Sequence, residues 1–175
     1  MMRKALVMGV AAAALLAATS VAGASNGKQR VVVERFVDEF SFVAADCSDF
    51  GSYDFSIQVD GTARVSITDV VAEDGSVLET VLHVVFDEKD TNTVSGKSLR
   101  LHGAVHEVFD YGSNTRTLSG AVVIGTERGR GTYVQDTGRI TMTLDTRVAQ
   151  FVAGPHEAFF AGLDPMVCAA LADNP

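Results

Sequence analysis

The sequence predicts an all-β domain, an antiparallel barrel or sandwich of about eight strands with one short C-terminal helix. Three observations indicate this fold class. Apolar and polar residues alternate along most of the chain, β-branched residues are frequent in the alternating segments, and short turn motifs separate them. The connections are too short for crossover helices, which argues against a parallel α/β sheet. Regular meander spacing of this kind is typical of antiparallel barrels and sandwiches.

The first 24 residues are predicted to form a secretory signal peptide. A positive start, Arg3 and Lys4, precedes an uncharged run rich in Ala, Leu and Val, and small residues lead to the expected cleavage site at Ala24-Ser25. Residues 25–175 then form one secreted domain, large enough to bury a core. No later apolar run reaches membrane length, so we expect a soluble extracellular protein without stable membrane insertion.

The elements follow one another along the mature chain. The predicted strands cover residues 30–42, 53–59, 62–72, 77–87, 97–110, 116–126, 132–135 and 139–151. Glycine motifs predict turns at Asp60-Gly61 and at Asp136-Thr137-Gly138, and a polar loop covers residues 88–96. Because Asp164 suits a helix N-cap and Pro165 the first helical position, residues 166–172 are predicted to form the helix.

The two cysteines, Cys47 and Cys168, are predicted to form a disulfide, the usual state of a cysteine pair in an exported protein. This bond would fasten the terminal helix to the segment after the first strand. In the chain-entropy model, closing so long a loop stabilises the fold by about 4–5 kcal/mol. Neither cysteine has a second one at metal-ligand spacing, so a metal site is not expected there.

The charge balance is acidic. The full chain has 14 basic and 22 acidic residues, a net charge of −8, and removal of Arg3 and Lys4 with the signal peptide leaves −10. Such a surface repels nucleic acid and anionic lipid head groups, so neither is an expected partner. No cofactor motif is present, and no cofactor is expected.

Several short motifs resemble a known group of proteins. These motifs are Cys47 and residues 73–75, 93–99, 136–139, 153–156 and 168–171. Together they resemble a family of uncharacterised secreted actinobacterial proteins over most of the mature chain. Strand order and length also resemble, more weakly, antiparallel β-barrels of the allene oxide cyclase type. The first resemblance implies export and a type of fold rather than a reaction, because none of its motifs is catalytic.

Histidines provide the strongest candidate metal site. His102 and His106 share the polar face of strand 97–110, opposite Leu99, Leu101, Val105 and Phe109. His83 and Glu79 lie on the polar face of strand 77–87. In a hairpin whose paired residue numbers sum to 185, His83 lies opposite His102 and Glu79 opposite His106. Three imidazoles and a carboxylate could bind a divalent metal. A solvated outer face explains the same pattern.

Other polar residues have simpler interpretations. Asp136 and Arg139 flank a predicted turn, where a local ion pair is the plain alternative to acid–base chemistry. His156 is expected in the turn before the helix, as a polar turn residue or a catalytic base. Phe159 and Phe160 are expected to pack in the core, where they would close one end of a barrel.

The expected function is non-enzymatic binding of a small apolar ligand or a cell-envelope partner. A barrel with an unfilled interior would favour the ligand. The alternatives are a small-barrel isomerase or cyclase-like enzyme, favoured by an inward-pointing Glu or His, and a secreted metal-binding protein using the histidines.

Overall fold

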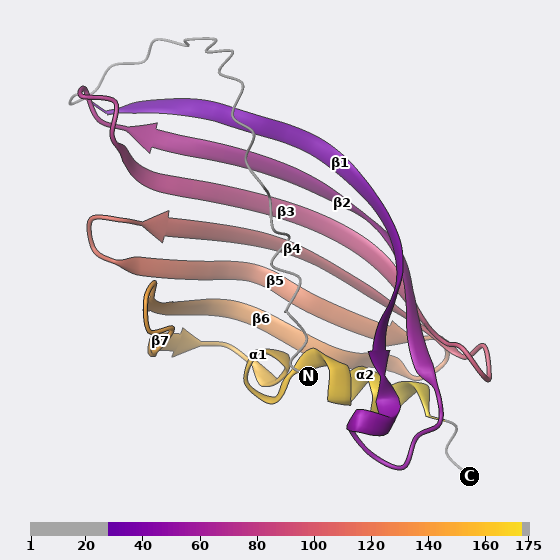
Figure 1. Ribbon diagram of the computed structural model, residues 1–175. Helices are drawn as coiled ribbons and strands as arrows, with labels where there is room; N and C mark the ends of the chain where they lie inside the picture. Colours follow the sequence, from indigo (N-terminus) through magenta and orange to yellow (C-terminus); the bar gives the residue numbers. More distant parts are fainter. Residues whose placement is uncertain (1–27, 173–175) are drawn as a thin grey trace.

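The computed structural model describes residues 28–172, and the predicted signal peptide lies outside them. Seven strands form a single sheet in which each strand pairs antiparallel with the next along the chain (Figure 1). The strands are β1 (Gln29–Asp46), β2 (Ser56–Val71), β3 (Val77–Asn92), β4 (Ser98–Asp110), β5 (Thr115–Glu127), β6 (Gly131–Thr143) and β7 (Ala149–Ala153). The short helices are η1 (Cys47–Asp49), α1 (Glu157–Ala161) and α2 (Leu163–Leu171). The antiparallel all-β class is therefore confirmed.

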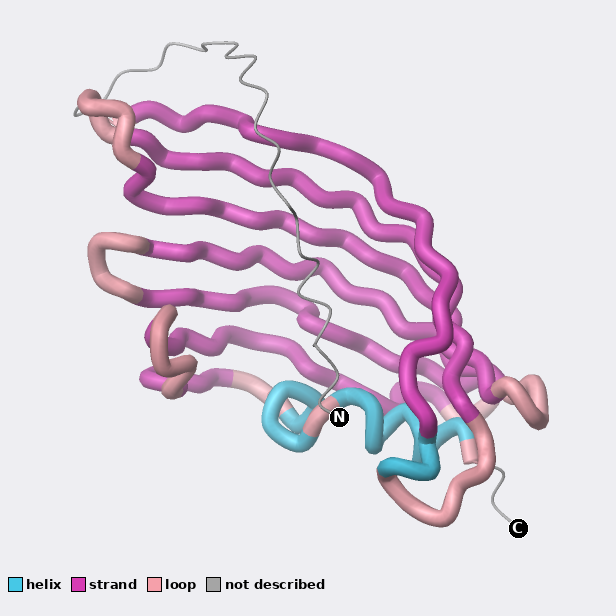
Figure 2. The backbone as a smooth tube through the Cα atoms, in the orientation of Figure 1, coloured by secondary structure: helices cyan, strands magenta, loops and turns pink. Residues whose placement is uncertain are grey.

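The sheet is strongly curved, and its helices lie on the concave face at one end (Figures 1 and 2). Its strand order begins at β1 and ends at β7, so the described sheet does not close. The expectation of a closed barrel or a two-sheet sandwich is wrong. One reason is the length of β7, whose five residues pair with β6 alone and provide little edge for closure against an 18-residue β1.

Two predicted turns are continuous strand instead. Asp60-Gly61 lies inside β2, and Asp136-Thr137-Gly138 lies inside β6. At Gly61 the absent side chain makes room for an aromatic ring, since a Cβ there would lie 2.7 Å from Cζ of Phe40 on β1. Gly138 pairs with Gly120 across β5 and β6, which keeps the ladder running through the segment. Glycine in these strands serves close packing, and the real turn between β6 and β7 lies further on.

The predicted disulfide is confirmed. Cys47 in η1 bonds Cys168 in α2 with a Cα–Cα distance of 5.6 Å, and neither residue is exposed. Polar contacts reinforce this attachment: the Asn92 amide donates to the Leu171 carbonyl at 3.1 Å. The predicted helix is present, but it begins at Leu163. Its N-cap is Gly162 rather than Asp164, which lies in the first turn.

The core lies between the helices and one end of the concave face. It is formed by residues whose side chains alternate inward along the strands, together with α2 and the disulfide. Its fully buried members are Cys47, Ile57, Leu99, Leu101, Val134, Val167, Cys168 and Leu171. Because the helices occupy this end only, the other end of the concave face is left to the strands (Figure 1).

Candidate functional site

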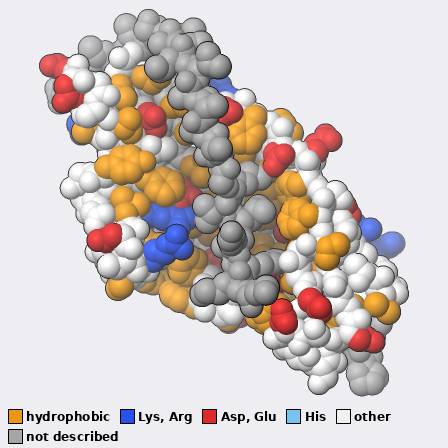
Figure 3. Space-filling model, in the orientation of Figure 1, with side chains coloured by type: hydrophobic (Ala, Val, Ile, Leu, Met, Phe, Trp, Pro, Cys, Tyr) orange, Lys and Arg blue, Asp and Glu red, His pale blue; other side chains and the backbone are white. Residues whose placement is uncertain are grey.

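The concave face beyond the helices carries a row of apolar residues, one on each strand. Phe36, Val65, Val84 and Val105 pair directly from β1 to β4. Gly120 and Gly138 continue this concave row on β5 and β6. Next to it, Ile67 and Leu82 continue the apolar face. Leu118 and Ile140 lie on the same face but are buried in a second small core with Met142, and Val105 packs against this core. In the space-filling view, hydrophobic side chains gather across this face (Figure 3).

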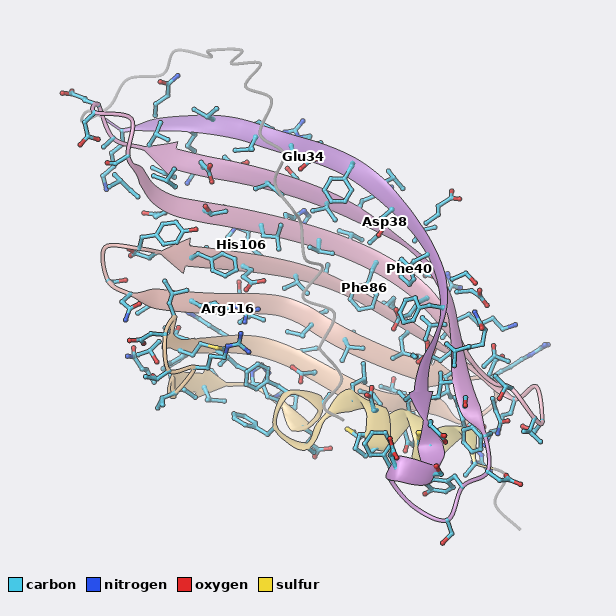
Figure 4. All side chains as sticks on the ribbon, in the orientation of Figure 1. Glu34, Asp38, Phe40, Phe86, His106 and Arg116 are labelled. Carbon is cyan, nitrogen blue, oxygen red and sulfur yellow. A yellow bond between two sulfur atoms is a disulfide. The ribbon has the colours of Figure 1, made fainter. Side chains whose placement is uncertain are left out.

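Charged groups also lie on the concave face, among these apolar residues. Glu34 and Asp38 project from β1, and Arg116 lies across the face on β5 (Figure 4). Arg116 forms an ion pair with Glu107, whose residue is only 6% exposed. The Arg116 guanidinium also lies over the Phe109 ring, 5.5 Å from its centroid. Glu107 is thus an inward-pointing acid of the kind that would favour an enzyme, but its carboxylate is paired with the Arg116 guanidinium.

A second buried polar pair joins β6 to the segment before α1. His156 Nδ1 lies 2.7 Å from Asp136 Oδ1, and both side chains are 1% exposed. His156 Nε2 lies 3.0 Å from the Ala153 carbonyl, and the other Asp136 oxygen accepts the Phe159 N–H at 2.8 Å. Both acceptors are satisfied when each ring nitrogen carries a hydrogen. Enclosed and fully bonded, this pair fastens α1 to the sheet.

The sequence interpretation missed the Asp136–His156 pair because it placed Asp136 in a turn. A usable signal was present: Val134, Asp136, Ile140 and Met142 have the same parity, and all four are buried. A carboxylate in an inward position needs a partner. The aromatic residues after His156 were also misread, since Phe159 and Phe160 are 39% and 61% exposed rather than core residues.

The histidines lie on the convex face in a register different from the expected one. The hairpin of β3 and β4 exists, but its paired numbers sum to 189, so His83 lies opposite His106 and Asp87 opposite His102. Glu79 lies opposite Asp110 at the far end of the pairing. The longer β3 causes this shift, because it extends through the expected polar loop to Asn92. Within residues 28–172, no group of three or more His, Cys, Asp or Glu side chains could hold a metal.

The convex face has two shallow hollows on either side of Arg64 and Val85. The first, of about 570 Å³, is lined by Arg35, Arg64, Ser66 and His83 among others. The second, of about 430 Å³, is lined by Arg64, Val85, Asp87 and His102 among others. Apolar side chains such as Val37 and Val85 make up more of the lining of these hollows than the arginines and histidines do.

One ionisable side chain at the helix end of the sheet has a shifted pKa. Burial raises the pKa of the Tyr133 phenol, whose hydroxyl donates to the Met166 carbonyl at 2.7 Å. Because only the protonated phenol can donate this hydrogen bond, neutral Tyr133 attaches α2 to β6. In the described part of the chain, no helix is long and apolar enough to cross a membrane.

In comparisons with known proteins, no family model, no curated protein and no solved structure matches this chain.

Proposed function

We propose that the protein is a non-enzymatic extracellular binding domain that holds an elongated apolar ligand against the concave row. The observation that carries this proposal is the row itself: Phe36, Val65, Val84 and Val105 pair in direct register on a curved surface. Gly120 and Gly138, which follow them on β5 and β6, have no side chains that project from this surface. With strands about 4.8 Å apart, six strands give a surface about 24 Å long. That length suits a long acyl or isoprenoid chain.

Binding is favoured over catalysis because the buried polar side chains already have hydrogen-bond or ion-pair partners. Among the described residues, the buried acid beside the concave row, Glu107, is paired with Arg116. The buried His156 is bonded at both ring nitrogens. A general acid or base must reach its substrate. Neither group has a free position for that work, whereas apolar side chains can bind a ligand as they stand.

Export is part of the proposal. The predicted signal peptide and the Cys47–Cys168 disulfide support an oxidising, extracellular location. A protein outside the cell that holds an apolar molecule would keep it dispersed in water or deliver it to the envelope.

The test compares paired substitutions on the two faces. Nile red, a neutral apolar dye, is titrated into the protein and followed by its fluorescence. Val84→Thr with Val105→Thr replaces two methyl groups of the concave row by hydroxyls at nearly constant volume. Losing about 0.8 kcal/mol for each methyl weakens binding about tenfold.

The matched control is Val81→Thr with Val85→Thr, on the convex face of β3. It keeps dye affinity within about twofold of the parent. Equal losses in both variants, or no binding by the parent at micromolar dye, would contradict the proposed function. Thermal melts of all variants report whether each remains folded.

A further inference from the structure

The convex face carries a polar row directly behind the apolar residues of the concave side. Its members pair in direct register from β1 to β6: Arg35, Ser66, His83, His106, Ser119 and Arg139. Arginines stand at both ends, hydroxyls lie next to them, and two imidazoles occupy the centre. At about 4.8 Å between strands, this convex row is about 24 Å long.

The two rows that flank the convex row on β1 to β6 contain no acid, although the whole chain has a net charge of −8. On one side lie Val37, Arg64, Val85, Ala104, Ala121 and Thr137. On the other side lie Val32, Thr68, Val81, Val108, Thr117 and Thr141. An acid-free strip three residues wide therefore crosses an acidic protein and attracts anions locally.

The guanidinium groups of the strip are available for a ligand. Arg35, Arg64 and Arg139 are exposed, and none forms an ion pair with another described residue. Outside the strip, Arg100 pairs with Asp87 at 2.7 Å, and Arg116 and Arg130 also form ion pairs. The Arg139 guanidinium lies 5.8 Å from the Phe151 ring centroid, a contact that holds the group without satisfying its N–H donors.

The remaining members add hydrogen-bonding capacity. His83 and His106 are exposed and directly opposite each other. The Ser119 hydroxyl donates to the His106 carbonyl at 3.2 Å and can still accept. The larger convex hollow, of about 570 Å³, lies at the β1 end beside Arg35 and Ser66. Together these residues form a line of hydrogen-bonding groups, with a hollow at the β1 end.

We infer that the convex row binds a linear anionic polysaccharide, with sulfate, phosphate or carboxylate groups lying on successive strands. Guanidinium groups bind planar or tetrahedral oxyanions through paired N–H bonds, and serine hydroxyls suit the sugar oxygens between them. The line does not converge on one point, so a chain of anions fits it better than a single ion. Nucleic acid fits less well, because from β1 to β6 the three rows have no aromatic residue on which bases could stack, and the Phe151 ring at the β7 end is in contact with the Arg139 guanidinium. This site lies on the opposite face from the apolar ligand and does not depend on it.

The experiment measures dextran sulfate binding by calorimetry at about 0.1 M salt. The parent binds at micromolar concentration, whereas Arg35→Gln with Arg139→Gln binds at least about tenfold more weakly, since charge-assisted hydrogen bonds are lost at both ends. Arg128→Gln with Arg130→Gln, in the β5–β6 turn, makes the same change in net charge about 30 Å along β5 from Ser119. That control stays within about threefold of the parent.

Two further probes separate the polysaccharide from other polyanions. Uncharged dextran does not bind, and a 20-nucleotide oligothymidylate binds at least about tenfold more weakly than dextran sulfate. The inference is overturned by an oligothymidylate affinity equal to that of dextran sulfate, by equal losses in the two double variants, or by no dextran sulfate binding. Nile red binding is measured on the same variants, so a failure here is distinguishable from a failure of the proposed apolar site.

Discussion

Replacing Asp136 by Asn tests whether the buried Asp136–His156 pair holds the C-terminal segment to the sheet. The carboxylate accepts from His156 Nδ1 at 2.7 Å with one oxygen and from the Phe159 N–H at 2.8 Å with the other. An Asn side chain has one oxygen and one NH₂ group, so it can accept only one of these bonds. With that oxygen on the Phe159 N–H, its NH₂ group faces His156 Nδ1 and can bond it only in the ring tautomer that carries its hydrogen on Nε2, so both charge-assisted bonds of the carboxylate are replaced by neutral ones.

The magnitude follows from this mismatch. A hydrogen bond to a charged group contributes about 1.5–3 kcal/mol against about 1 kcal/mol for a neutral one, and two such bonds of the carboxylate become neutral. We expect Asp136→Asn to lower the free energy of unfolding by about 2–3 kcal/mol, which corresponds to a fall in Tm of roughly 5–10 °C. Urea unfolding gives the free energy, provided the slope against denaturant is unchanged.

Asp54→Asn is the control, because Asp54 is exposed. It should change stability by less than about 0.5 kcal/mol. A loss below about 1 kcal/mol in Asp136→Asn would refute the reasoning and show that the pair contributes little to the attachment of α1.

The other predictions concern the disulfide, the packing at Gly103 and a turn. Replacing Cys47 and Cys168 by Ala removes a 121-residue cross-link and should cost about 4–5 kcal/mol in urea unfolding; a loss under about 1 kcal/mol would contradict it. Gly103→Ala places a Cβ 2.4 Å from Cε1 of Phe86 and 2.6 Å from the Val122 carbonyl oxygen, and should cost about 1–3 kcal/mol. Phe86→Leu in the same chain should restore the part of this cost that comes from the ring; additive losses would speak against the ring clash. The pKa of Asp110 is lowered from 3.8 because its carboxylate accepts N–H groups of the β4–β5 turn. That stabilisation is present above pH 3.8 and is lost as pH falls through the lower folded pKa, so an NMR titration midpoint at or above 3.8 would exclude it.

The fold class was accessible from the sequence because strand alternation and cysteine pairing are local or pairwise signals. Turn assignment failed where glycine had a tertiary role. Asp60-Gly61 has the composition of a hairpin turn, but Gly61 is needed beneath the Phe40 ring of another strand. Nothing in the local composition distinguishes these two uses of glycine.

The predicted sites depended on the pairing register of neighbouring strands. The sequence pattern excludes odd shifts of this register but does not distinguish one even shift from another. Apolar faces match equally well in any even shift, so His83 could not be placed against His106 rather than His102 without the true length of β3. Whether the sheet closes into a barrel could not be predicted either, because this depends on whether β1 and β7 pair. Both rows of the sheet, concave and convex, become visible only when six strands are aligned.

The most direct test of the proposed apolar site places the ligand on one face. A hexadecane chain carrying a terminal nitroxide spin label is added to the protein, and methyl resonances of neighbouring valines on β3 are followed by NMR. The concave-row proposal predicts that Val84 broadens more strongly, and at lower ligand concentration, than its sequence neighbour Val85 on the convex face. Broadening of Val85 instead of Val84, or of neither at saturating ligand, would contradict the proposal.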